Sequence, residues 1–117
     1  MPRSAAEFHL DPVEVSDAVS ALVRDGDATI QKVADELGVS RRSMQRYLAD
    51  SGVTFSGIRD QAVNHAALTM LAHTAMPIAV ISRKLGYKNP SSFTRAFVRW
   101  NGVTPLNYRR LERREVS

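Results

Sequence analysis

Apolar residues recur at intervals of three and four along most of the chain, and no segment of strand length alternates apolar with polar residues. That spacing is the period of an α-helix, so the pattern predicts an all-α fold. Residues that favour helix starts, and glycines that favour helix ends, divide the chain into about seven helices with short connections. With their capping residues, the predicted segments are 11–25, 29–38, 40–50, 55–74, 77–86, 89–100 and a last helix from 104 onward.

These segments predict one domain over residues 11–114. Residues 1–10 are expected to be a tail or a linker remnant, and residues 115–117 a short tail. The longest helix, at about residues 55–74, occupies the middle of the domain. Apolar residues four apart predict its buried face: Ile58, Ala62, Ala66 and Met70.

One helical pattern occurs twice, at Ile30–Leu48 and again at Ile78–Phe97. In each copy a short helix is followed by a glycine-containing turn and a second helix, which is the order of a helix-turn-helix motif. The copies align at an offset of 48 residues up to the glycine, after which the second has one more turn residue. They predict two helix-turn-helix subdomains, at about 29–50 and 77–100, joined by the long central helix.

The central helix would set the distance between the two subdomains. Roughly 20 helical residues span about 30 Å, and successive major grooves on one face of B-DNA lie about 34 Å apart. The second helix of each motif, at about 40–50 and 89–100, is therefore expected to enter one of two successive major grooves. A single chain would then bind an asymmetric site.

Charge is distributed unevenly along the chain. Residues 1–39 hold three basic and eight acidic side chains, whereas residues 40–117 hold thirteen basic and four acidic ones. A basic region of this density is expected of a protein that binds a polyanion. Thirteen of the sixteen basic residues are arginines, which favour forked hydrogen bonds to phosphates and guanine edges. The imbalance thus supports double-stranded DNA as the partner.

Two stretches of the repeat are distinctive: VADELGVSRRSMQRYL, from Val33, and LGYKNPSSFTRAFVRWNGVTPLNYRR, from Leu85. The second contains G-[FY], S-x-F-x-R-x-F and G-x-T-P-x-x-Y-R. Together they resemble the C-terminal DNA-binding domain of the AraC/XylS transcription regulators, over about Val13 to Arg110. The resemblance implies sequence-specific DNA binding. It also implies either a fragment of a longer regulator, with an N-terminal effector or dimerisation domain as partner, or a stand-alone member.

The second helix of the first unit is expected to supply most of the base contacts. Its face opposite Met44 and Leu48 offers arginines for guanine and a glutamine for adenine, and the resemblance implies base contacts there as well. Ser40 caps the helix and is a phosphate candidate. The predicted base-contacting residues are Arg41, Arg42, Gln45 and Arg46.

The second unit presents shorter side chains on the corresponding face, and its Phe93, Phe97 and Trp100 are predicted core residues. It is therefore expected to contribute more to placement on DNA and less to discrimination between sequences. The predicted base contacts are Ser91, Thr94 and Arg95, and the predicted phosphate contacts are Lys88, Asn89, Ser92 and, in the last helix, Arg109.

The composition argues against several other classes of protein. The chain has no Cys and no glycine-rich phosphate loop, and His9, His65 and His73 lack metal-ligand spacing. No enzymatic activity, metal or cofactor is expected. No apolar run is long enough to cross a membrane, so we expect a cytoplasmic, nucleoid-associated protein.

A second interpretation stays open at this point. The repeat would then be a helical scaffold of a protein-interaction module, whose acidic N-terminal third contacts the transcription machinery, such as RNA polymerase, without sequence-specific DNA recognition. A titration of duplex DNA against salt separates the two interpretations.

Overall fold

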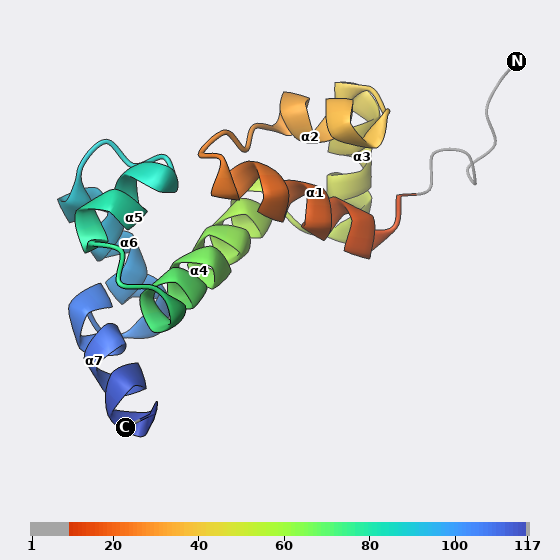
Figure 1. The fold of residues 1–117 in the computed structure, drawn as a ribbon. Coiled ribbons are helices and arrows are strands. Elements are labelled where there is room, and N and C mark those ends of the chain that lie inside the picture. The colour runs from red at the N-terminus through yellow and green to blue at the C-terminus, as the bar shows by residue number, and fades with distance from the viewer. Residues whose placement is uncertain (1–9, 117) are drawn as a thin grey trace, which may run out of the picture.

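A computed structural model describes residues 10–116, and all regular secondary structure in that range is α-helical. Figure 1 shows α4 as a central rod, with α1, α2 and α3 around one end and α5, α6 and α7 around the other. The all-α prediction, with two helix-turn-helix subdomains on a long central helix, is confirmed. The helices of the described range are α1 (Pro12–Arg24), α2 (Ile30–Leu37), α3 (Arg41–Ser51), α4 (Phe55–His73), α5 (Ile78–Lys84), α6 (Pro90–Asn101) and α7 (Pro105–Val116).

Side-chain caps position the helix starts. Asp11, Thr29, Ser40 and Asn89 each accept a hydrogen bond from a backbone amide of the following turn, at 2.9 to 3.2 Å. These amides have no partner within the helix, so the caps stabilise each start. All four caps follow the sequence prediction. Thr54 caps α4 in the same way, at 3.0 Å, and was not anticipated.

The first helix-turn-helix unit, α2 and α3, closes a small aliphatic core. Val33 and Ala34 of α2 are fully buried, as is Met44 of α3, and Leu48 is 6% exposed. The small Ala34 lies at the position where the two helices of the motif pack. The inward face of α3 is thus the face that the sequence predicts.

The second unit, α5 and α6, has the same plan with a larger core. Ile81, Phe93 and Phe97 are fully buried, and Ser82 is the buried polar residue of the unit. The Ser82 hydroxyl donates to the carbonyl of Asn89 at 3.3 Å, so its polar atom is satisfied. A chain of tilted aromatic rings crosses this half of the molecule, with centroids 5.5 to 5.9 Å apart, through Tyr87, Phe93, Phe97 and Tyr108.

The buried face of α4 differs from the prediction. The buried positions are Val63, Ala67 and Leu71, which lie one residue after Ala62, Ala66 and Met70 of the predicted stripe. The predicted Ala62 and Ala66 are half-buried, as are Ile58 and Met70. The reason is that α1 packs on α4 near one end and α7 near the other. A helix that packs against two other helices buries the face that lies between them. The spacing of its apolar residues does not by itself determine which face that is.

The domain boundaries also differ at their edges. Leu10, predicted as part of a tail, is 6% exposed and belongs to the core. Helix α7 continues to Val116, into the predicted C-terminal tail at 115–117. Residues 1–9 and 117 lie outside the described residues, so the tail prediction is not tested there.

Candidate nucleic-acid interface

Helix α3 presents four long polar side chains to solvent. Ser40 caps its start, and the buried Met44 and Leu48 fix which face points inward. The other face carries the predicted base-contacting residues, and all of them are exposed. None of these four side chains has a hydrogen-bond or ion-pair partner among the described residues, so their donors are free for a ligand: Arg41, Arg42, Gln45 and Arg46.

Helix α6 presents a shorter outer surface. Asn89 caps it, Pro90 occupies its first position, and Phe93 and Phe97 point inward. On the outer face Ser91 and Arg95 are exposed, whereas Thr94 is half-buried. One guanidinium nitrogen of Arg95 lies 3.5 Å from the Ser92 hydroxyl, which is a long hydrogen bond and leaves most of the donors of Arg95 available.

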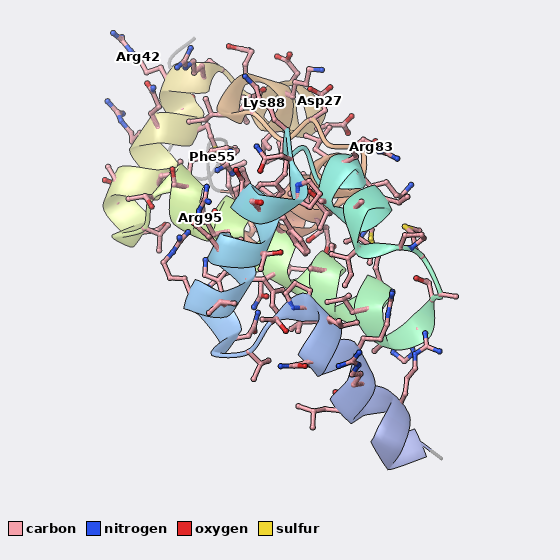
Figure 2. The ribbon with its side chains drawn as sticks, turned by 90° about the vertical axis from the view of Figure 1, so that its left-hand side faces the viewer. Asp27, Arg42, Phe55, Arg83, Lys88 and Arg95 are labelled. Atoms are coloured by element: carbon pink, nitrogen blue, oxygen red, sulfur yellow. The ribbon has the colours of Figure 1, made fainter. Side chains whose placement is uncertain are left out.

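The two outer faces lie on one side of the molecule. In Figure 2, Arg42 of α3 and Arg95 of α6 both project to the left, although α4 separates their helices, whereas Arg83 of α5 lies on the opposite side. The fold therefore brings together side chains that are about fifty residues apart in sequence. Helical periodicity predicts the outward face of each helix, but only the arrangement of the two units about α4 puts the two faces on one side.

The predicted phosphate contacts before and at the starts of α3 and α6 differ in exposure and in whether their side chains already cap a helix. Lys88 is exposed in the turn before α6. The side-chain oxygens of Ser40 and Asn89 already accept from the amides of Ser43 and Ser92, at 3.0 and 2.9 Å, so these two caps shape the helix starts. Ser92 is half-buried, with its hydroxyl close to Arg95.

Arg109, a predicted phosphate contact, directs two of its donors to the end of α4. Its Nε donates to the Leu71 carbonyl at 3.1 Å, and one terminal nitrogen donates to the Thr74 carbonyl at 3.2 Å. Arg113 donates to the same Thr74 carbonyl at 2.7 Å. Two cations thus satisfy free carbonyls at the C-terminal end of α4, where the helix dipole favours positive charge. Burial, and then the charge of Arg113, lower the pKa of Arg109.

Arg99 is a candidate that the sequence analysis missed. It is exposed on α6, one helical turn after Arg95, and its guanidinium carbon lies 5.9 Å from the ring centroid of Trp100. The four-residue spacing from Arg95 was the available signal, since residues four apart share a helix face.

Little of the basic charge is neutralised within the protein. Two ion pairs occur among the described residues, Lys32 with Asp27 and Arg59 with Asp60, the second at 3.8 Å. Neither involves α3 or α6. The positive potential of these helices is therefore directed to solvent.

A cleft of about 180 Å³ lies where the two units approach each other beside α4. Asp27 and Ala28 line it from the loop between α1 and α2, Arg59 and Val63 from α4, and Tyr87 from the second unit. Burial raises the pKa of Tyr87, and the nearby charge of Asp60 raises it further.

The same described residues carry no metal-like constellation and no membrane-length helix. No three His, Cys, Asp or Glu side chains within them come together as a metal site would require. No helix among them has both the length and the apolar character needed to cross a bilayer.

Two family models match the chain, and both describe helix-turn-helix domains. A family model described as a helix-turn-helix domain matches residues 33–111, more than half of the chain. A second model, described as the helix-turn-helix domain of resolvase, matches residues 14–51, which include the first unit.

Curated relatives are transcription regulators. The ornithine utilization regulator of Pseudomonas aeruginosa is 37% identical over 89 residues, which make up 75% of this chain and 26% of that protein. The RCS-specific HTH-type transcriptional activator RclR of Escherichia coli is 34% identical over 82 residues, which make up 69% of this chain and 29% of that protein. The chain thus spans between a quarter and a third of the length of these relatives.

Solved structures share the fold. A DNA-binding transcriptional dual regulator from Escherichia coli K-12 has a TM-score of 0.75 and 20% identity, over 91% of this chain and 97% of that one. A regulator with an AraC-type DNA-binding domain from Chromobacterium violaceum has a TM-score of 0.71 and 21% identity, over 86% and 92%. Together with the two outward basic helices, these matches show that the chain belongs to the AraC-type helix-turn-helix family, the sequence-specific DNA-binding domains of transcription regulators.

Proposed function

We propose that this domain binds an asymmetric duplex site by placing α3 and α6 in two successive major grooves. The observation that carries the proposal is the position of Arg42 and Arg95, which project to one side of the molecule from helices held at opposite ends of α4 (Figure 2). The 19 residues of α4 span about 28 Å, close to the groove repeat of about 34 Å. Slight bending of the DNA would account for the difference between the span of α4 and the groove repeat.

Base contacts are assigned chiefly to α3. Its exposed arginines suit the O6 and N7 atoms of guanine, and its glutamine suits adenine. For α6 we assign Ser91, Thr94 and Arg95, and we add Arg99 because it extends the same exposed face. The α3 set is Arg41, Arg42, Gln45 and Arg46.

Phosphate contacts are assigned to the helix starts and the turn before α6. Lys88 supplies a free charge, and the amides at the starts of α3 and α6 supply the dipole, with Ser40, Asn89 and Ser92 in support. We leave Arg109 out of this set because its donors are directed to the end of α4.

Selection of binding sites from random duplexes tests the proposal. The expected result is two conserved blocks about 10 base pairs apart, centre to centre, that are not inverted copies of each other. A single conserved block, or a palindrome, would contradict it. Binding to the selected duplex should weaken steeply with salt, because Lys and Arg release counterions from the phosphates.

A partner surface on α1 is the second candidate. Glu14 and Asp17 are exposed there, and Val13 is 64% exposed, in a region of the opposite charge to α3. A contact with RNA polymerase is proposed for this face. Charge reversal of Glu14 and Asp17 should then reduce transcription from a template carrying the selected site while leaving DNA affinity unchanged.

The remaining expectations concern the whole protein. An N-terminal effector or dimerisation domain, and a location in the cytoplasm at the nucleoid, are proposed from the family resemblance. Size determination and localisation of the native protein would test both.

A further inference from the structure

The loop that joins α1 to the first helix-turn-helix unit touches a turn of the second unit, backbone against backbone. Gly26 lies in the loop after α1, and Gly86 lies in the turn between α5 and α6; both have positive φ, +73° and +93°. A Cβ atom on Gly26 would lie only 2.9 Å from the carbonyl oxygen of Lys84. A Cβ atom on Gly86 would lie 3.4 Å from the carbonyl oxygen of Gly26. We call this pair of glycines and the Lys84 carbonyl the loop contact.

The loop contact lies beside α4 and spans the gap between the two units. Figure 1 shows the loop after α1 close to the α5–α6 turn, and in Figure 2 the labelled Asp27 and Lys88, which follow Gly26 and Gly86 in the sequence, lie at the same end of the molecule. The neighbouring space is the cleft of about 180 Å³ lined by Asp27, Arg59 and Tyr87. Side chains thus leave a hollow next to the point where the backbones meet.

We infer that the loop contact fixes the angle between the two units, and with it the spacing and helical phase at which α3 and α6 meet DNA. Helix α4 fixes the distance between the units, because a helix resists compression. Rotation of one unit relative to the other about α4 is limited where the two loops touch. Gly26 allows this approach because it has no side chain, and a methyl group there would overlap the Lys84 carbonyl.

The inference deepens the proposed function and rests on it for its consequence on DNA. Each added base pair moves one groove contact by about 3.4 Å and turns it by about a tenth of a helical turn. A protein with a fixed angle between its recognition helices should therefore accept one spacing of the two blocks and reject its neighbours. Loosening the loop contact should relax that preference.

The test compares Gly26→Asn with Gly52→Asn. Gly52 has φ +72°, almost the value of Gly26, but a Cβ there would meet nothing within 4 Å. Asn tolerates positive φ better than other residues with a side chain, so both variants should fold. The two substitutions impose the same change of backbone preference, and only the first one crowds the loop contact.

A distance measurement reports on the angle without DNA. The chain has no Cys, so spin labels can be attached at Glu36→Cys in α2 and Ala79→Cys in α5, both exposed. Gly26→Asn should lengthen or broaden the distance between the labels, and Gly52→Asn should leave it as in the parent. Equal distributions in both variants would overturn the inference.

Binding to a spacing series provides the second readout. The duplexes carry the selected blocks at the preferred spacing and at one base pair more or fewer. In Gly26→Asn the ratio of the affinity at the preferred spacing to the affinity at its neighbours should fall about tenfold, and in Gly52→Asn it should stay as in the parent. An unchanged preference in Gly26→Asn contradicts the inference. Absence of any two-block DNA binding by the parent contradicts the proposed function instead, and the label distances then still decide the role of the loop contact.

A smaller substitution at the same position covers the case in which Gly26→Asn does not fold. Gly26→Ala adds only the Cβ atom that would lie 2.9 Å from the Lys84 carbonyl oxygen, and Gly52→Ala is its control. Gly26→Ala should shift the label distance relative to Gly52→Ala, and no shift would overturn the inference.

Discussion

The two helix-turn-helix units share a backbone plan but differ in what they bury and what they expose. The first has an aliphatic core around Met44 and exposes four long polar side chains on α3. The second has an aromatic core around Phe93 and Phe97 and exposes mostly short side chains with Arg95 on α6. Repetition of a motif therefore does not imply repetition of its role.

This difference suggests a division of tasks between the units. Long side chains with free donors can reach base edges, so the first unit is suited to discriminate between sequences. Phe97 of the second unit packs on Tyr108 of α7, and Arg109 of α7 donates to a carbonyl near the end of α4. The second unit is thus anchored to α4 through α7, so it is suited to position the domain. The following variants test the division, beginning with the largest expected effect.

Removal of a core side chain should cost more in the second unit. Phe93 is fully buried and contacts the rings of Tyr87 and Phe97. Phe93→Ala should lower the free energy of unfolding by about 3–5 kcal/mol, and Met44→Ala by less, within the range of about 2–5 kcal/mol for such a change. Urea denaturation measures both. A larger loss for Met44→Ala would contradict the asymmetry of the cores, and the exposed Val98→Ala serves as the control.

Removal of an arginine proposed to contact bases should reduce discrimination between sequences most in the first unit. Arg46→Ala should reduce the ratio of specific to non-specific affinity by about 1–3 kcal/mol while leaving weak, salt-sensitive binding. Arg95→Ala should reduce that ratio by less. Equal losses from the two variants would contradict the division of tasks. Arg83→Ala is the matched control, because Arg83 is exposed on the opposite side of the molecule (Figure 2).

Removal of a proposed phosphate contact should weaken DNA binding without changing the preference for one sequence over another. Lys88 is exposed in the turn before α6. Lys88→Ala should lower affinity for all duplexes about equally and reduce the slope of log K against log salt by about one. Fluorescence anisotropy at several salt concentrations measures the slope. A loss confined to the selected sequence would assign Lys88 to base recognition instead.

The smallest effect concerns pH and the aromatic core of the second unit. Burial, and then the charge of Asp60, raise the pKa of Tyr87 above the ordinary value of 10.0, and Arg59 and Arg99 offset part of that rise. The folded state therefore holds this proton more tightly than the unfolded chain does. The resulting stability is complete below pH 10.0 and is lost as the pH rises through the folded pKa.

Tyr87→Phe should remove this dependence on pH. The difference in unfolding free energy between parent and variant should be constant up to about pH 9 and change at about pH 11, since tyrosine ionises near pH 10. The ring contact with Phe93, at 5.5 Å, would be kept. A constant difference across this range would mean that Tyr87 ionises alike in both states.

The sequence by itself determined the local structure and the family. Caps such as Asp11 and Asn89, and apolar positions three and four apart, act within one helical turn, so a linear pattern contains their effect. The outward faces of α3 and α6 follow from the same reasoning. The repeat of the motif then gives the architecture of two units on a central helix.

The tertiary structure alone decided how these elements meet. The buried face of α4 depends on where α1 and α7 pack, and Leu10 is buried for the same kind of reason. Arg109 donates to a carbonyl near the end of α4, 38 residues away, and no pattern in the sequence predicts that contact. Gly26 and Gly86 are 60 residues apart, and neither indicates the other in sequence. Contacts between distant segments depend on the packing angles of whole helices, and no periodicity of the chain encodes those angles.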